Sequence, residues 1–98
     1  MQSLLLRVVS SGEKISVKSE KSETGMLDKR TIVLQELGGD FESTYVVSAL
    51  GNLASIEFHK GDLVFATLKF QSHEYNGQLY MDIVAKELVK KQIVFILS

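Results

Sequence analysis

The chain contains no cysteine, no proline and no tryptophan among its 98 residues. The absence of cysteine excludes a disulfide scaffold, a thiolate metal site and a cysteine nucleophile. The longest uninterrupted apolar run covers residues 93–97, far short of the roughly 20 residues that a membrane-spanning helix needs. The first residues lack both a basic region and a long apolar stretch, so we expect no signal peptide. We therefore expect a cytoplasmic protein that does not associate with membranes.

The chain as a whole also lacks an excess of positive or negative charge. Eleven lysines and arginines oppose twelve acidic residues, giving a net charge of −1. A strongly basic chain would indicate a nucleic-acid partner, and this total does not. The distribution is uneven, however, with a net charge of +2 over residues 1–30, −4 over 31–62 and +1 over 63–98. Any surface that binds a polyanion must therefore be built from the first and last thirds.

The spacing of apolar residues indicates β-structure. Apolar side chains recur mainly at every second position, which is typical of strands. Gly12 interrupts the first apolar segment and predicts a bend there, because glycine within a strand marks a bulge or a sharp turn. The polar residues 19–30 predict a long loop. The predicted strands cover residues 4–18, 31–37, 42–50, 63–72 and 79–89.

Turns and one helical segment separate these strands. Residues 38–40 (Gly-Gly-Asp) and 76–77 (Asn-Gly) predict hairpin turns, the second because Asn-Gly tolerates positive φ at both positions. Leu53 and Ile56 have helical spacing, with Asn52 as the candidate N-cap, and predict a short helix within residues 51–59 that ends before Gly61. A single domain with the order β-β-β-α-β-β is the plan of the all-β, five-stranded OB-fold barrel.

The end of the sequence is apolar on both faces. Residues 93–97 read Ile-Val-Phe-Ile-Leu, with neither charge nor proline to protect an exposed strand from edge pairing. This segment either packs beside the first strand of its own barrel or pairs with another subunit. We favour a homo-oligomer, a dimer or a tetramer, since symmetric assembly is common and joins shallow grooves into a longer one.

Three segments together resemble a known family. They are residues 45–54 (YVVSALGNLA), 59–65 (HKGDLVF) and 74–85 (EYNGQLYMDIVA). Their order is strand, glycine, helix, Lys-Gly-Asp, strand, aromatic-tipped hairpin and strand. In this order and spacing the chain resembles the OB-fold single-stranded-DNA-binding proteins of bacteria and phages, and more closely a group of small bacterial relatives of that family. The resemblance covers roughly residues 27–89.

The resemblance implies that single-stranded DNA lies across the barrel face, held by stacked aromatic side chains and scattered bases. Tyr75 matches the family's aromatic near the tip of the hairpin, and Tyr80 matches a tyrosine early in the last core strand. From its place in a turn, Tyr75 is either a stacking residue or a packing anchor for the loop.

The chain also departs from the family pattern. Leu50 stands where the family commonly has an aromatic, and Asn52 stands where it commonly has a base. Gln71 and His73 replace the arginines that are usual in the hairpin. These departures imply weaker or altered binding.

Alternation assigns faces on the last predicted strand. Leu79, Met81 and Ile83 are expected in the core, so Tyr80 points outward as a second stacking candidate. Asp82 and Lys86 share the face of Tyr80. Asp82 is expected to pair with Lys69 or Lys86, a weak interaction if it is exposed.

Three other aromatic residues are assigned in the same way. Phe65 and Phe70 are five positions apart and so lie on opposite faces of their strand. Phe70 shares a face with apolar residues 64, 66 and 68 and is expected in the core. Phe65 is the surface candidate, with Lys69 beside it as a phosphate contact. Tyr45 shares a face with apolar residues 47 and 49, which favours a core or subunit-interface position.

Lys29 and Arg30 end the first predicted loop. The corresponding loop in OB-folds forms one side of the ligand groove, so both are candidate phosphate contacts. Lysine and glutamate alternate over residues 18–23, which is equally typical of a solvated loop.

Nothing in the sequence indicates an enzyme. His59 and His73 are far apart in the chain and have no convincing ligand partners, which argues against a metal site. Neither a phosphate-binding glycine-rich loop nor a nucleophile elbow is present. We expect a non-enzymatic protein without a cofactor.

Two function classes follow. The first is sequence-independent binding of single-stranded DNA in replication or recombination, in a bacterium, a phage or a mobile element, by aromatic stacking and basic phosphate contacts. The second is an OB-fold protein-interaction or assembly module without nucleic-acid binding, favoured by the near-neutral charge and the missing arginines. A weaker alternative is an RNA or oligosaccharide ligand on the same fold.

Overall fold

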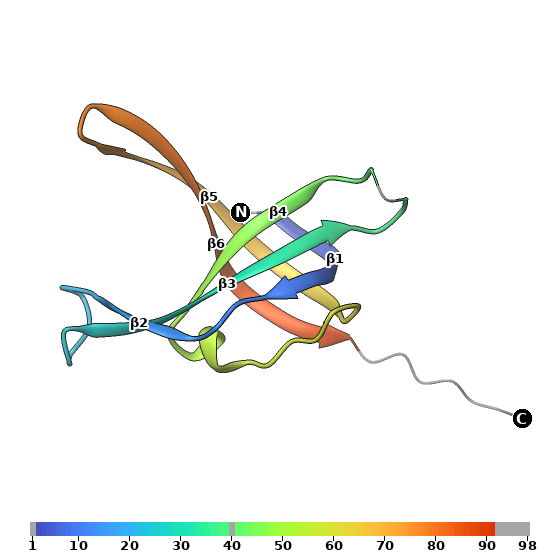
Figure 1. Ribbon diagram of the computed structural model, residues 1–98, viewed down its shortest axis with the longest axis horizontal. Helices are drawn as coiled ribbons and strands as arrows, with labels where there is room; N and C mark the ends of the chain where they lie inside the picture. Colours follow the sequence, from blue (N-terminus) through green and yellow to red (C-terminus); the bar gives the residue numbers. More distant parts are fainter. Residues whose placement is uncertain (1, 40, 92–98) are drawn as a thin grey trace, which may run out of the picture.

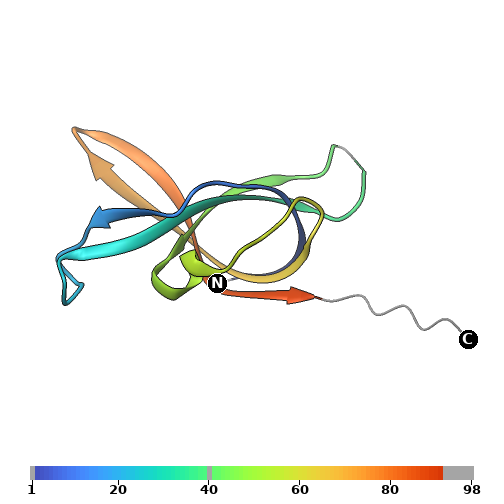
Figure 2. The ribbon, with the colours of Figure 1, turned by 60° about the horizontal axis from the view of Figure 1, so that its bottom comes forward.

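The computed structural model describes residues 2–39 and 41–91. The described residues form a single mixed sheet with the order β1-β5-β6-β4-β3-β2, which closes into a barrel because β1 also pairs with β3 (Figures 1 and 2). The ladders between described strands are antiparallel except for one parallel pair, Ser48 of β4 with Val84 of β6. The elements are β1 (Gln2–Ser11), β2 (Ile15–Lys18), β3 (Met26–Glu36), β4 (Thr44–Leu50), the 3-10 helix η1 (Gly51–Ser55), β5 (Leu63–Tyr75) and β6 (Gln78–Lys91).

The first strand of the barrel is broken at Gly12, as predicted. β1 pairs with both β5 and β3, whereas β2 continues along β3 alone. The Gly12 N–H donates to the carbonyl of Thr31 at 2.8 Å, and a Cβ at position 12 would lie 3.2 Å from that oxygen. Before the break the chain pairs with β5 and β3, and after it the chain pairs with β3 alone. β1 and β2 together correspond to the single predicted first strand.

The core lies inside the barrel and comes from alternate positions of its strands. Ile32 and Leu34 of β3 and Val47 and Ala49 of β4 are fully buried, while their sequence neighbours are partly or fully exposed. The same alternation holds on β1 and on the first half of β5. The remaining residues of the main apolar cluster are Leu6, Val8, Phe58, Val64, Ala66, Leu68, Ala85 and Leu88.

Two strand boundaries differ from the predictions. β3 begins at Met26, five residues before the predicted start, because residues 26–29 pair with β2 although Asp28 and Lys29 are charged. The predicted long loop is therefore confined to residues 19–25. β6 runs on through Lys90 and Lys91, which pair with Val64 and Leu63 of β5. The predicted strand over residues 93–97 lies outside the described residues.

The helical segment is shorter than predicted and differently capped. η1 is a five-residue 3-10 helix, and Leu50 occupies its N-cap without any side-chain hydrogen bond, so the assignment of Asn52 as N-cap was wrong. Gly51, with φ of 62°, turns the chain out of β4. Burial of Ala54 and a hydrogen bond from Arg30 Nε to the Ala54 carbonyl, at 2.8 Å, hold this short turn against the barrel.

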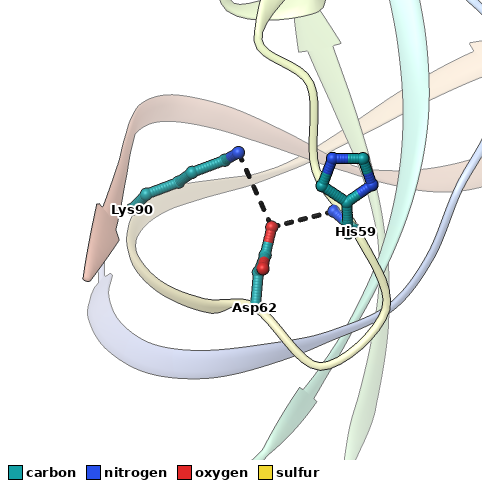
Figure 3. Close-up of polar contacts among 3 residues, drawn as sticks. All are labelled: His59, Asp62 and Lys90. Atoms are coloured by element: carbon teal, nitrogen blue, oxygen red, sulfur yellow. Dashed lines mark hydrogen bonds and ion pairs between the residues drawn. The ribbon is translucent and has the colours of Figure 1, made fainter. Parts of the chain in front are cut away.

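The loop after η1 is fastened to the end of β6. Asp62 Oδ2 accepts a hydrogen bond from the backbone N–H of His59 at 2.8 Å and lies 3.6 Å from Lys90 Nζ (Figure 3). The backbone of Val8 in β1 exchanges hydrogen bonds with Gly61 and Asp62. The His59 hydrogen bond, assisted by the charge of Lys90, lowers the pKa of the Asp62 carboxyl group below its ordinary value, against a smaller opposing effect of burial.

The β5–β6 hairpin extends well beyond the barrel. The β1–β5 ladder starts at Gln2 and Leu68, whereas β5 and β6 stay paired as far as Tyr75 and Gln78. The hairpin closes through Asn76 and Gly77, whose φ values of 52° and 77° confirm the predicted Asn-Gly turn. We call residues 69–82 the arm; it projects at the upper left of Figure 1.

The arm overturns three core assignments. Leu79 and Met81 are 79% and 72% exposed and Phe70 is also exposed, whereas Ile83 at the base of the arm is half-buried and packs against the core, as predicted. These residues do follow the alternation of the core positions, and they occupy one face of the hairpin. Phe70, Leu79 and Met81 are not enclosed because, among the described residues, β1 pairs with β5 only as far as Leu68.

Candidate nucleic-acid interface

Two hairpins project from the same side of the barrel. Figures 1 and 2 both show the arm and the β2–β3 hairpin extending to the left, with β4 crossing between their bases. In OB-folds the outer surface of the second and third barrel strands, here β3 and β4, together with the two flanking hairpins, is the usual ligand surface.

One face of the arm is aromatic. Tyr75 pairs with Gln78 and His73 pairs with Tyr80, so all four side chains lie on the same side of the hairpin. Tyr75 is 64% exposed, and Tyr80 is exposed as well. Both stacking candidates are therefore on one surface, and we call Tyr75, His73 and Tyr80 the aromatic face.

His73 is the residue of this surface that sequence reasoning missed. Its ring stacks on Tyr80 with centroids 5.5 Å apart and planes inclined by 22°. Its Nδ1 lies 2.9 Å from Asp82 Oδ2, so the predicted pairing of Asp82 with Lys69 or Lys86 was wrong. The Tyr80 hydroxyl donates to Gln78 Oε1 at 2.8 Å. The two-residue turn was the available signal, because it aligns position 73 with position 80.

The aromatic face is continuous with the outer surface of the barrel. Lys69 pairs with Val84, on the same side of the hairpin as His73, and Val84 in turn pairs with Ser48 of β4. Ser48 pairs with Thr31 of β3. Lys69 is exposed and lies about 13 Å along the strand from His73, at about 3.3 Å per residue.

The outer surface of β3 and β4 itself carries no aromatic side chain. Its paired residues are Val33 with Val46 and Thr31 with Ser48. At the end near the β2–β3 hairpin, Lys29 pairs with Leu50. The half-buried Lys29 therefore supplies a positive charge beside the position where the family commonly has an aromatic platform.

Arg30 is not part of this outer surface. It pairs with the buried Ala49 and so has the inward orientation of Ile32 and Leu34. Its Nε donates to the Ala54 carbonyl of η1. Sequence adjacency suggested that Lys29 and Arg30 act together, but neighbouring residues on a strand point to opposite faces.

The remaining predicted residues lie away from the two tyrosines. Phe65 is exposed, but it pairs with Leu5 and Val89 and lies ten residues, about 33 Å, from Tyr75 along β5. Lys91 Nζ lies 5.7 Å from the centroid of its ring. Lys86 is exposed in a β-bulge between the pairs Thr67–Glu87 and Leu68–Ala85, where the alternation that assigned it to the face of Tyr80 is interrupted.

Tyr45 has the core-side position that its alternation predicted. It is half-buried, packs on the core cluster and meets Phe70 edge to face, with centroids 6.3 Å apart. Its hydroxyl donates to Glu36 Oε1 at 2.5 Å. This hydrogen bond, with burial and the negative charge of Glu36, raises the pKa of the Tyr45 hydroxyl. Tyr45 therefore supports the base of the arm.

The geometry of the described residues argues against a metal site. Within residues 2–39 and 41–91, no three histidine or acidic side chains gather closely enough to hold a metal ion. A hollow at the tip of the β2–β3 hairpin is lined by Lys18, Glu20 and their neighbours, so its charges balance. In the same part of the chain, no helix is long and apolar enough to cross a membrane.

The fold is similar to a solved replication-protein domain. The second OB-fold domain of replication protein A from Methanococcus maripaludis, a solution NMR structure, matches with a TM-score of 0.69 at 15% sequence identity. The match covers 96% of this chain and 86% of that one. The predicted OB-fold is confirmed. No protein-family model and no curated protein gives a significant match to the sequence.

Proposed function

We propose that this protein binds single-stranded DNA without sequence preference, as a replication or recombination protein would. The observation that carries the proposal is the aromatic face of the arm, two exposed tyrosines and a histidine on one surface. Unpaired bases stack on exposed aromatic rings whatever their identity, because every base has a π-face. The likeness of the fold to a domain of replication protein A supports the same ligand class.

Basic side chains can follow the phosphates away from the stacked bases. Lys69 lies on the side of the hairpin that carries the aromatic face, and Lys29 lies across the sheet on β3. Lys86 is exposed in the bulge of β6. Asp82 contacts His73 and places one carboxylate on the same side of the hairpin. The proposed site is therefore Tyr75 and Tyr80 for stacking, with the three lysines as phosphate contacts.

The test is fluorescence anisotropy of a labelled oligo-dT, with duplex DNA and single-stranded RNA as competitors. Tyr75→Ala and Tyr80→Ala should each weaken binding by roughly 5- to 150-fold, the equivalent of about 1–3 kcal/mol per stacked base. Phe41→Ala is the matched control, because this ring is 103% exposed but lies in the β3–β4 turn, remote from the arm in Figure 1. Equal affinity of the wild type and both tyrosine variants would reject the proposal, as would failure to bind at low salt.

A second candidate function is that of a protein-interaction or assembly module. The exposed Leu79 and Met81, on the face of the arm opposite the tyrosines, favour it. Under this alternative oligo-dT does not bind at any salt concentration. Competition by single-stranded RNA as strong as competition by unlabelled oligo-dT would show that the aromatic face does not select DNA over RNA.

A further inference from the structure

The second face of the arm carries a row of apolar side chains on β6. Phe70 pairs with Ile83, and Met81 and Leu79 continue the same side of the hairpin toward the turn, opposite Ser72 and Glu74 of β5. We call these four residues the apolar face. Phe70, Met81 and Leu79 are exposed. A small protein rarely leaves such a patch open on a projecting hairpin unless another chain covers it.

The arm also offers free strand edges. Among the described residues, β1 pairs with β5 only as far as Leu68, and β4 meets β6 only at Val84. Residues 69–75 and 78–83 therefore pair with each other but with no third described strand. A row of open backbone N–H and C=O groups beside apolar side chains is a template for the addition of one more strand.

The sequence contains a segment of matching chemistry. Residues 93–97, Ile-Val-Phe-Ile-Leu, are β-branched, aromatic or aliphatic throughout and uncharged. Such residues favour strands. Added to an edge of the arm, alternate side chains of this segment would lie on the same side as the apolar face.

The segment cannot cover this surface within its own chain. Lys91 pairs with Leu63, at the far end of the ladder from the turn. Measured along β5, the pair Phe70–Ile83 is seven residues away, about 23 Å, and Leu79 is eleven residues away, about 36 Å. Residue 97 lies six positions after Lys91, so even a fully extended segment ends at most about 22 Å from Lys91. The segment therefore falls short of Leu79 and Met81, toward the turn.

We propose that the apolar face of the arm binds residues 93–97 of a second copy of this chain. Reciprocal exchange of the two segments closes a two-fold dimer, since the same contact is made twice. The aromatic face lies on the other side of each arm and stays free. The proposal therefore does not depend on DNA binding, and either can fail without the other.

The first experiment measures the mass of full-length variants by light scattering after size exclusion. Wild type should have a multiple of the 10.9 kDa chain mass. Leu79→Glu with Met81→Glu alters the arm, and Val94→Glu with Phe95→Glu alters the segment on both faces. Each double variant should run as a monomer at concentrations where wild type is associated, a loss of affinity of at least 100-fold. Leu37→Glu with Phe41→Glu, exposed apolar residues of the β3–β4 hairpin, should keep the wild-type mass.

The second experiment mixes the two monomeric variants. The arm variant has an intact segment and the segment variant has an intact arm, so together they can form one complete contact. We expect a heterodimer in the mixture and none in either variant alone, with circular dichroism showing the same β-spectrum in all samples. A mixture that remains monomeric overturns the proposal. A segment variant that keeps the wild-type mass overturns it too, because the arms would then pair with each other, and so does a monomeric wild type.

Discussion

Lys29 and Arg30 are neighbours in the sequence but have different surroundings. Lys29 lies in register with Leu50 on the outer surface of β3 and β4. Arg30 Nε donates a hydrogen bond to the Ala54 carbonyl and so holds η1 against the barrel. One position therefore belongs to the proposed phosphate path and the other to the stability of the fold.

Substitution of the two residues should separate these roles. Arg30→Met leaves the Ala54 carbonyl without its donor and should lower the free energy of unfolding by about 1–3 kcal/mol, without changing the salt dependence of oligo-dT binding. Lys29→Met should leave stability almost unchanged and reduce the slope of log affinity against log salt by about 0.7. Urea melts and anisotropy titrations measure the two effects. The reverse pattern would place Arg30, not Lys29, on the nucleic acid.

Asp62 makes a pH-dependent contribution to stability. Its pKa is lowered in the folded protein by the His59 N–H, so the carboxylate stabilises the fold above the unfolded-state pKa of about 4. This contribution is lost as the pH falls through the lower folded-state pKa. Asp62→Asn should therefore lower the Tm at pH 7, and its difference from wild type should vanish in stronger acid. Glu57→Gln, an exposed carboxylate of the same loop, is the control; an equal loss of Tm there would show a general charge effect.

The β5–β6 hairpin changes its environment along its length. Up to Leu68, β5 has β1 on one side and contributes fully buried residues to the core. From Lys69 onward the same alternation continues, but among the described residues β1 no longer pairs with β5. Each face of the arm is therefore available to a ligand, an aromatic face on one side and an apolar face on the other.

Truncating one leucine in each half of the hairpin should reveal this change. Leu68→Ala empties a fully buried position and should cost about 2–5 kcal/mol of unfolding free energy. Leu79→Ala removes the same atoms from an exposed position and should cost little in a monomeric background such as the Val94→Glu, Phe95→Glu variant. Equal losses in chemical denaturation would mean that the arm is packed against the barrel in solution.

The molecule as a whole is close to neutral, and the proposed interface has few lysines, of which Lys69 shares the side of the aromatic face. With a net charge of −1, long-range attraction to a polyanion is weak, and binding must depend on local contacts. In the proposed interface, aromatic stacking then supplies a larger share of the affinity than it would in a strongly basic protein. The acidic middle third contributes carboxylates mainly in the β3–β4 hairpin and the loop after η1, away from the arm.

This balance predicts a shallow salt dependence. If Lys29, Lys69 and Lys86 each neutralise one phosphate, log affinity for oligo-dT should fall with log salt with a slope of about −2. Titrations at four salt concentrations between 50 and 400 mM would measure it. A slope steeper than about −4 would show that the three lysines are not the main phosphate contacts.

Much of the fold followed from local patterns. Period-two alternation predicted all five barrel strands, Gly12 predicted the break and Asn76-Gly77 predicted the turn, because each depends on backbone chemistry within a few residues. The start of β3 was missed because residues 26–29 include the charged Asp28 and Lys29. These residues pair with β2 through their backbone, and side-chain polarity does not predict such pairing. The helical segment is a 3-10 helix of five residues, and its tertiary hydrogen bond comes from Arg30, which is more than twenty positions away in the sequence.

For the candidate site, too, local patterns predicted side-chain direction but not burial. The sequence alone determined which residues share a strand face, and so placed Tyr80 outward, because side-chain direction follows residue parity wherever a strand is regular. Only the tertiary structure decided which faces are covered. Phe70, Leu79 and Met81 have the parity of core residues, and they are exposed because, among the described residues, β1 pairs with β5 only as far as Leu68. Burial depends on what lies opposite a residue, and for this arm that is decided by a strand more than sixty positions away.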